Sequence, residues 1–203
     1  MKFLKYQNTY QLWKAKLYTF LLRKDFGGIG KGCRISSPLY SHDLSGVFLG
    51  NNCIIRADAW IGSIKTYANN QYDGRLEIGD GTSIGYRSHI FAAELVKIGT
   101  KVLMANGVYI SDNLHGYEDV DRSITSQPLV TPGPVIIEDN VWLGENVCVL
   151  PNVTIGKHSV IGSNSVVTKS IPAYSVAVGS PACVIKRYDS EQRVWKRVEK
   201  EMD

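Results

Sequence analysis

The sequence predicts a mainly β protein built as a parallel β-helix, and three observations predict this fold class. Aliphatic residues recur at every sixth position, at Ile137, Leu143, Val149, Ile155, Ile161 and Val167. Four residues after each of the first five stands a second side chain suited to an interior, namely Val141, Val147, Val153, Ser159 and Ser165. No long helical pattern separates these repeats, which excludes a doubly wound sheet.

The same spacing recurs earlier in the chain, in three blocks of three aliphatic positions. These are Leu49, Ile55 and Ile61, then Ile78, Ile84 and Ile90, then Ile98, Met104 and Ile110. A period of six matches neither a helix nor simple strand alternation, but it fits a short strand followed by a turn. Three such units form one coil, and stacked coils pair their strands in parallel about 4.8 Å apart. We expect this β-helix to span residues 29–186.

Two polar segments interrupt the repeat and are predicted to leave the stack. The first covers residues 62–77, and the second covers residues 111–134 and contains His115. Ile61 and Ile78, which flank the first interruption, are 17 positions apart, and Ile110 and Ile137, which flank the second, are 27 apart. Neither spacing is a multiple of six, so neither segment continues the coil. Long ordered loops on a rigid scaffold tend to carry function, so both segments are candidates for a site.

The two ends of the chain have helical patterns instead. Residues 1–28 form an N-terminal amphipathic segment whose apolar stripe is Tyr6, Tyr10, Trp13, Leu17 and Leu21. Residues 187–203 are predicted to form a C-terminal helix, because Asp189 and Ser190 are candidate N-caps. Its apolar stripe would be Val194, Trp195, Val198 and Met202. The first helix is expected to cap the open end of the stack, and contact with a membrane surface is the alternative.

The composition, with 44% hydrophobic and 21% charged residues, is that of a soluble globular protein. The formal charge of +4 does not indicate nucleic-acid binding, but residues 1–24 carry six basic side chains and no acid. This basic segment favours an anionic surface as a partner, with a solvated helix face as the alternative. Residues 17–22 are too short an apolar run for a signal peptide, and the four scattered cysteines predict no metal site. We expect a cytoplasmic protein.

Residues 135–187 carry a motif series that resembles a known family. The series "VWLG…LPNVTIG…IGSNSVVTKSIP…VGSPACVIKR" is similar to the C-terminal half of hexapeptide-repeat acetyltransferases. It resembles most the enzymes that O-acetylate sugars, including polysaccharide O-acetyltransferases and the galactoside and maltose acetyltransferases. The resemblance implies a left-handed β-helix, a homotrimer with active sites between subunits, and acetyl-CoA as the donor.

In this family, a histidine in the loop after an interrupted coil is the general base, and His115 stands at the matching place. A sugar hydroxyl is a very weak acid, and an imidazole is suited to taking its proton near neutral pH. A solvated loop histidine is the alternative. His42, His89 and His158 are weaker candidates.

The resemblance also assigns residues to the transition state and to the donor. The backbone at Gly144 and the N–H of Glu145 match the oxyanion-binding position, where relatives often carry serine instead of glutamate. Trp142 matches a residue along the pantetheine arm, although plain packing is equally open. Ser163, Thr168, Lys169, Lys186 and Arg187 match donor-binding positions, and Cys183 departs from relatives that carry arginine there.

The acceptor is expected to be rich in hydroxyl groups. Hydrogen bonds to it would come from Asp112, Asn113 and Tyr117, while Tyr67 and Tyr72 would stack on a sugar ring. A turn-forming role for Asp112 and Asn113 is the alternative. The expected acceptor is a precursor of a surface polysaccharide such as O-antigen, capsule or exopolysaccharide. We expect its acetylation to take place in the cytoplasm or at the inner face of the cytoplasmic membrane.

Other functions remain open at this stage. An amino sugar, serine or a streptogramin-type drug could be the acceptor, and an amine would use the same base. A γ-type carbonic anhydrase has the same fold but needs three histidine ligands, and no two histidines here are closer than 26 residues. A non-catalytic scaffold is the last alternative, and the presence of His115, Trp142 and Lys169 argues against it.

Overall fold

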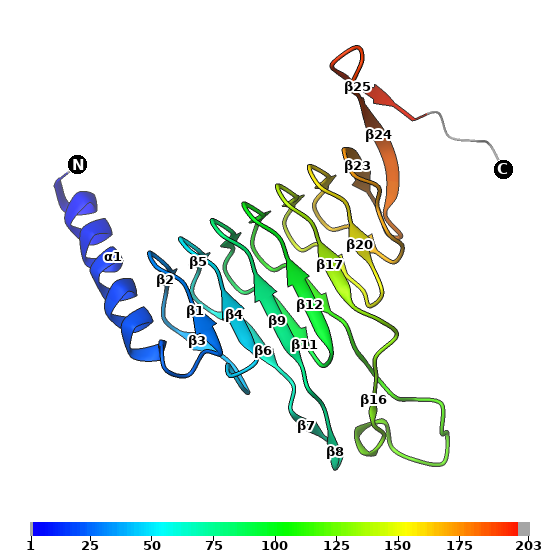
Figure 1. Ribbon diagram of the computed structural model, residues 1–203, viewed down its shortest axis with the longest axis horizontal. Helices are drawn as coiled ribbons and strands as arrows, with labels where there is room; N and C mark the ends of the chain where they lie inside the picture. The colour runs from blue at the N-terminus through cyan, green and yellow to red at the C-terminus, as the bar shows by residue number, and fades with distance from the viewer. Residues whose placement is uncertain (1, 199–203) are drawn as a thin grey trace.

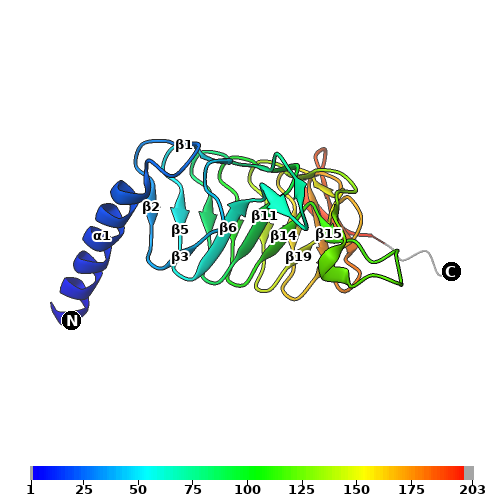
Figure 2. The same ribbon diagram turned by 90° about the horizontal axis from the view of Figure 1, so that it is seen from below.

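The computed structural model describes residues 2–198, and the side chains of residues 2–5 and 8 are left aside. One helix, α1 (Lys2–Leu22), precedes a three-sided prism of short strands that wind as a left-handed parallel β-helix (Figures 1 and 2). No described helix is long and apolar enough to cross a membrane. The predicted fold class is confirmed for the body of the chain.

Three sheets form the faces of the prism. Sheet A contains β1 (Gly28–Ile29), β4 (Val47–Leu49), β9 (Arg75–Ile78), β12 (Leu95–Ile98), β17 (Val135–Ile137) and β20 (Thr154–Ile155). Sheet B contains β2 (Arg34–Ile35), β5 (Ile54–Ile55), β10 (Ser83–Ile84), β13 (Leu103–Met104), β18 (Trp142–Leu143), β21 (Val160–Ile161) and β23 (Ser175–Val178). Sheet C contains β3 (Leu39–Tyr40), β6 (Ala59–Ser63), β11 (His89–Ala92), β14 (Tyr109–Ser111), β19 (Cys148–Val149) and β22 (Val166–Val167).

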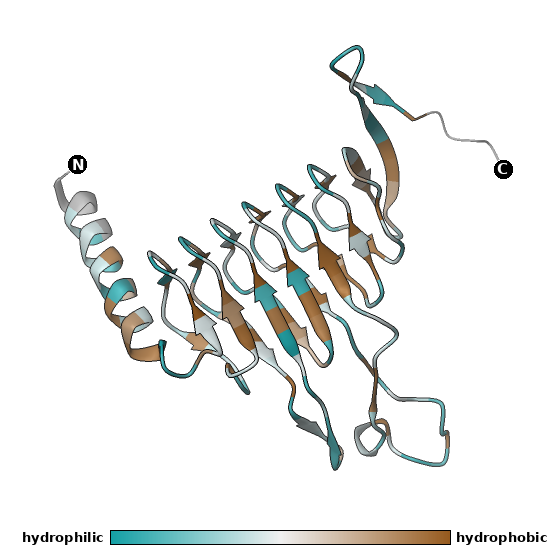
Figure 3. Ribbon diagram, in the orientation of Figure 1, coloured by the Kyte–Doolittle hydropathy of each residue, from teal (hydrophilic) through white to brown (hydrophobic). Residues whose placement is uncertain are grey.

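The six-residue repeat puts one aliphatic side chain per face and coil into the interior. Along sheet A, Leu49 pairs with Ile78, Ile78 with Ile98, and Ile98 with Ile137, so identical positions stack in register. These side chains are at most 5% exposed. In Figure 3 the strands carry the brown segments and the corner turns are mostly teal or white. The stacked inward side chains of each sheet form an apolar column along the prism. These columns keep water out of the interior.

The corners are tight because successive coils nearly touch there. A Cβ on Gly79 would lie 2.6 Å from the carbonyl carbon of Gly99 in the next coil. Asn140, Asn146 and Asn164 turn other corners with φ between 55° and 58°, a left-handed conformation that asparagine tolerates. The close approach of the coils therefore requires glycine at Gly79, and asparagine suits the left-handed position of the later turn.

Helix α1 covers the first coil with one face. The N–H of Ile35 donates to the Thr19 hydroxyl at 2.8 Å, and the N–H of Leu39 donates to the Tyr18 hydroxyl at 3.2 Å. Ala15 and Thr19 are buried by this docking. The predicted stripe from Tyr6 to Leu21 lies on the other side of the helix and is exposed. The helix exists as predicted, but a face other than its apolar stripe makes the contact.

The predicted C-terminal helix is wrong over residues 187–198. The chain forms β24 (Cys183–Asp189), which pairs antiparallel with β23, and β25 (Val194–Arg197), which pairs with β24. The Asp189 carboxylate accepts from the N–H groups of the turn and pairs with Lys196 at 2.6 Å. An open edge of sheet B gains hydrogen bonds from this hairpin, which a helix would not supply. Met202 lies outside the described residues.

Both interruptions leave the stack at the corner where sheet C meets sheet A. The first holds the hairpin β7 (Thr66–Tyr67) and β8 (Asn70–Gln71). The second holds β15 (Leu114–His115), the 3₁₀ helix η1 (Ile124–Ser126) and β16 (Leu129–Val130). β6 extends to Ser63 and β9 begins at Arg75, so the first excursion is shorter at both ends than residues 62–77. Figure 1 shows both excursions projecting on the same side of the prism.

The neighbouring isoleucines of β5 test the interior column. Ile55 is 0% exposed and Ile54 is half-buried on the outer surface. We expect Ile55→Ala to lower the free energy of unfolding by about 2–5 kcal/mol, because it leaves a cavity in the column. Ile54→Ala is the control and should cost less in denaturant unfolding at equal protein concentration. Equal losses for the two variants would contradict the inward packing.

Candidate active site

The two excursions contact each other through residue pairs that are 48 and 57 positions apart in the chain. The ring of Tyr67 lies 5.1 Å from that of His115, centroid to centroid. The N–H of Leu129 on β16 donates to the Tyr72 hydroxyl at 2.7 Å. The first excursion therefore braces the second at two points, one of which is the predicted base.

His115 is exposed, but its backbone is held in place. β15 and β16 pair antiparallel, and His115 stands opposite Leu129, the residue that Tyr72 contacts. The imidazole therefore lies on a short two-stranded ribbon against Tyr67, with its surface open to solvent. A ligand in front of this ribbon can reach the imidazole without any rearrangement of the prism.

Asp112 anchors the base of the second excursion. It is 0% exposed, and its carboxylate accepts from the N–H groups of Ala93 and Glu94, both at 2.8 Å. The Asn113 side chain donates to it at 3.0 Å. The carboxylate thus has no surface to offer to a sugar hydroxyl, and in this structure Asp112 and Asn113 take the turn-forming role.

The tip of the second excursion is organised by a residue that the sequence pattern does not single out. The Gln127 side chain is 4% exposed, donates to the carbonyl oxygen of Asp119 at 2.9 Å and accepts from its N–H at 3.2 Å. Tyr117 extends from the same tip and is 65% exposed. In the sequence, Gln127 is marked only by the proline that follows it. Tyr117, with Tyr67 near His115, remains accessible to a ligand.

Trp142, Gly144 and Glu145 lie on another part of the prism. Trp142 points outward from sheet B and is 49% exposed, and Gly144 and Glu145 turn the corner toward sheet C. A Cβ on Gly144 would lie 2.7 Å from the Ser163 nitrogen, so only glycine allows this approach of two coils. The Glu145 carboxylate accepts from the Asn106 side chain at 2.9 Å. Glu145 thus joins two coils through its side chain, and its N–H donates to no group within residues 2–198.

The predicted donor-binding cations lie at the C-terminal end of the stack. Thr168 and Lys169 follow β22 at the corner between sheets C and A, whereas Lys186 and Arg187 lie on β24. None of these three cations forms an ion pair within residues 2–198. They are free to meet phosphate groups.

A single chain does not assemble the whole predicted site. His115, Tyr67 and Lys169 lie at the corner between sheets C and A. Trp142, Gly144 and Ser163 lie on sheet B or at its corner with sheet C. The filled interior separates the two groups, and a close-packed core does not let corners approach.

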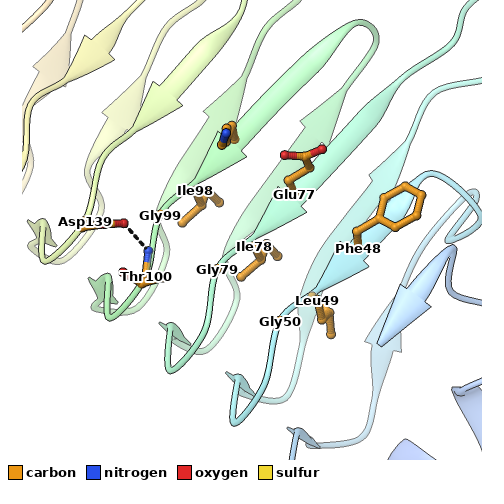
Figure 4. A pocket seen from close by; sticks show the side chains of 11 residues that line it. Phe48, Leu49, Gly50, Glu77, Ile78, Gly79, Ile98, Gly99, Thr100 and Asp139 are labelled. Atoms are coloured by element: carbon orange, nitrogen blue, oxygen red, sulfur yellow. Dashed lines mark hydrogen bonds between the residues drawn. The ribbon is translucent and has the colours of Figure 1, made fainter. Parts of the chain in front are cut away.

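The other histidines and the groove on sheet A do not join either group. His42 and His89 pack against Trp60 with ring centroids 5.1 and 5.6 Å away, and His158 stacks on Tyr174 at 5.3 Å. Within the described residues, no three His, Cys, Asp or Glu side chains gather as a metal site would require. A shallow groove of about 350 Å³ on sheet A, drawn in Figure 4, contains no predicted site residue.

Comparisons with known proteins agree with the repeat pattern. Residues 134–169 match the bacterial transferase hexapeptide (six repeats), and residues 75–112 match the hexapeptide repeat of succinyl-transferase. No curated protein sequence matches the chain significantly. The resemblance to hexapeptide-repeat proteins is confirmed.

Solved structures share this fold. AntD, an N-acyltransferase from Bacillus cereus in complex with dTDP and 3-hydroxybutyryl-CoA, has a TM-score of 0.71 at 20% identity, covering 86% of this chain and 90% of its own. A variant of AntD in complex with dTDP-4-amino-4,6-dideoxyglucose and coenzyme A has the same TM-score at 19% identity, with coverage of 86% and 90%. A hexapeptide-repeat acetyltransferase from Vibrio cholerae O1 biovar eltor, complexed with acetyl coenzyme A, has a TM-score of 0.56 at 22% identity, with coverage of 86% and 79%.

The contact between the excursions is testable with paired tyrosine variants. We expect Tyr72→Phe to lower the free energy of unfolding by about 0.5–1.5 kcal/mol and to speed amide hydrogen exchange in residues 112–134, because the Leu129 N–H loses its acceptor. Tyr67→Phe is the control, since no hydrogen bond of the Tyr67 hydroxyl is present within the described chain. Unchanged exchange in Tyr72→Phe would show that the two excursions are independent.

Proposed function

Because this chain carries bacterial transferase hexapeptide repeats on a left-handed β-helix, we propose that it transfers an acetyl group from acetyl-CoA to a sugar hydroxyl. The observation that carries the proposal is the placement of His115, exposed and braced by Tyr67 at a corner of a rigid prism. A general base needs both properties, because it must reach the substrate and must hold its position.

The reaction requires one general base and a set of hydrogen-bond donors that stabilise the oxyanion. The His115 imidazole takes the proton of the acceptor hydroxyl while the oxygen attacks the thioester carbonyl. The carbonyl oxygen becomes an oxyanion, which the N–H of Glu145 stabilises. Collapse of this intermediate breaks the carbon–sulfur bond, and the imidazolium returns its proton to the CoA thiolate. The products are the acetyl ester and CoA.

A complete site on this scheme needs a second copy of the chain. His115 and Glu145 lie at different corners of one prism, so a neighbouring copy must bring its Trp142 and Glu145 to the first copy's His115. The outer row of sheet B includes Leu103 and Trp142, which are 51% and 49% exposed and suit contact with another chain or a pantetheine arm. We expect a homotrimer with three such sites.

The donor's phosphates would bind toward the C-terminal end of the stack. Lys169, Lys186 and Arg187 are free of ion pairs in the described chain and match the charge of a pyrophosphate and a 3′-phosphate. Ser163 lies on the Trp142 side of the prism and Thr168 lies beside Lys169 at the corner between sheets C and A, so on this scheme one donor meets them on neighbouring copies. No metal takes part in this scheme.

The second candidate is N-acylation of an amino sugar. It is favoured by the likeness to AntD, described as an N-acyltransferase and solved with a dTDP-linked amino sugar. An amine acceptor would use the same base and the same oxyanion donor. Assays of acetyl-CoA consumption with a hydroxyl sugar and its amino counterpart would separate the two. For the first candidate, we expect the acceptor to be a surface-polysaccharide precursor in the cytoplasm.

The role of His115 is tested by His115→Ala. Loss of the base should lower kcat by about 10²–10⁴-fold while acetyl-CoA binding is kept. His158→Asn is the control, because His158 adopts a φ of 56° that asparagine also accepts, and its loss should leave turnover near the original value. Turnover by His115→Ala close to that of the unmodified enzyme would exclude the base.

The donor end is tested by Lys169→Ala. We expect about tenfold weaker CoA binding in calorimetry, equivalent to one lost charge-assisted contact of ~1.4 kcal/mol. Lys97→Ala removes an exposed lysine of sheet A and should leave CoA affinity unchanged. Equal affinities for both variants would place the CoA phosphates elsewhere.

A further inference from the structure

A groove of about 500 Å³ lies between α1 and the first three coils of sheet B. Its walls come from α1, from β2 and from the corners that follow β2, β5 and β10. Among the lining residues are three cations, an aromatic ring and two hydroxyl groups: Lys14, Arg34, Arg56, Tyr86, Ser36 and Ser37. None of the sequence-predicted site residues lies in it.

The cations of the groove have no anionic partner in the described part of the chain. Lys14, Arg34 and Arg56 come from three separate elements, no acidic residue lines the groove, and none of the three forms an ion pair with a described residue. Asp58 follows Ala57 at the same corner but does not line the groove. Arg56 lies 5.9 Å over the Tyr86 ring, which orients its guanidinium group. Three like charges held around one cavity favour a multivalent anion as ligand.

The groove lies in line with the proposed reaction centre. Arg34 pairs in register with Ile54, Ile54 with Ser83, Ser83 with Leu103, and Leu103 with Trp142, so all five share the outer face of sheet B. Three strand spacings separate Ile54 from Trp142, which is roughly 14 Å along the prism. A ligand that reacts beside Trp142 and extends toward the N-terminus would therefore bring its far end to the groove.

We propose that this groove binds the diphosphate of the acceptor, which is then a glycosyl diphosphate. This proposal rests on the proposed acyl transfer and specifies its acceptor. The guanidinium groups of Arg34 and Arg56 can each donate two hydrogen bonds to phosphate oxygens, and Lys14 adds a third charge. The hydroxyls of Ser36 and Ser37 can donate further hydrogen bonds to the phosphate oxygens. Both nucleotide-linked and polyprenyl-linked sugars carry this diphosphate.

The test is calorimetry on the full chain, first with CoA alone and then with CoA kept at saturation. CoA binding reports on the proposed function separately and prevents the CoA site from taking up the probes. The probes are inorganic pyrophosphate, dTDP-glucose and farnesyl diphosphate. Tighter binding of dTDP-glucose than of farnesyl diphosphate would indicate a nucleotide-linked acceptor, and the reverse order a lipid-linked one. Equal binding would indicate recognition through the diphosphate alone.

The variants Arg34→Gln and Arg56→Gln should each weaken pyrophosphate binding by tenfold or more and leave CoA affinity unchanged. Arg56→Lys should restore part of the loss, and Lys97→Gln, which removes one charge from sheet A, should have no effect. Thermal unfolding of each variant checks that it is folded. The proposal is overturned if the CoA-saturated protein does not bind pyrophosphate, if Lys97→Gln has the same effect as Arg56→Gln, or if the arginine variants weaken CoA binding instead.

Discussion

The register of the inward aliphatic columns is the constraint on which the rest of the structure depends. Ile78, Ile98 and Ile137 are direct neighbours in successive coils, and each is nearly fully buried. A filled prism of this kind keeps its three corners at fixed separations, because its interior cannot be compressed. The candidate site residues therefore lie at corners, on outer faces or on the excursions, and the coils set the spacing of the corners.

This constraint explains which features could be predicted from the sequence. The columns appear as a six-residue period because each strand and turn repeats the same packing, and the two excursions appear wherever the period fails. The C-terminal hairpin has no periodic pattern by which the sequence could reveal it. Val194, Trp195 and Val198 have helical spacing, but Trp195 instead packs on Tyr188 with ring centroids 5.4 Å apart, across two paired strands. An open sheet edge is a tertiary property that local spacing does not reveal.

The candidate site was predicted in part for the same reason. The position of His115 beside an interruption is visible in the sequence, but the roles of its neighbours depend on contacts between distant segments. Asp112 is an acid close to His115 in sequence, yet its carboxylate holds the corner at Ala93 and Glu94. Tyr72 was expected to stack on a sugar ring, and the sequence did not reveal that its hydroxyl also accepts from the Leu129 N–H. The basic groove forms only when α1 docks on sheet B, so its lining residues are scattered from Gln11 to Tyr86.

The departure of both excursions from one corner has a consequence for how such proteins diversify. The hairpin and the longer loop share contacts with each other but replace no residue of the buried columns. Mutations, insertions or whole exchanges in these two segments can therefore accumulate together while the buried columns of the scaffold stay unchanged. On the acyl transfer proposed above, paired replacement of these two segments would change the preferred acceptor and leave the coils as they are.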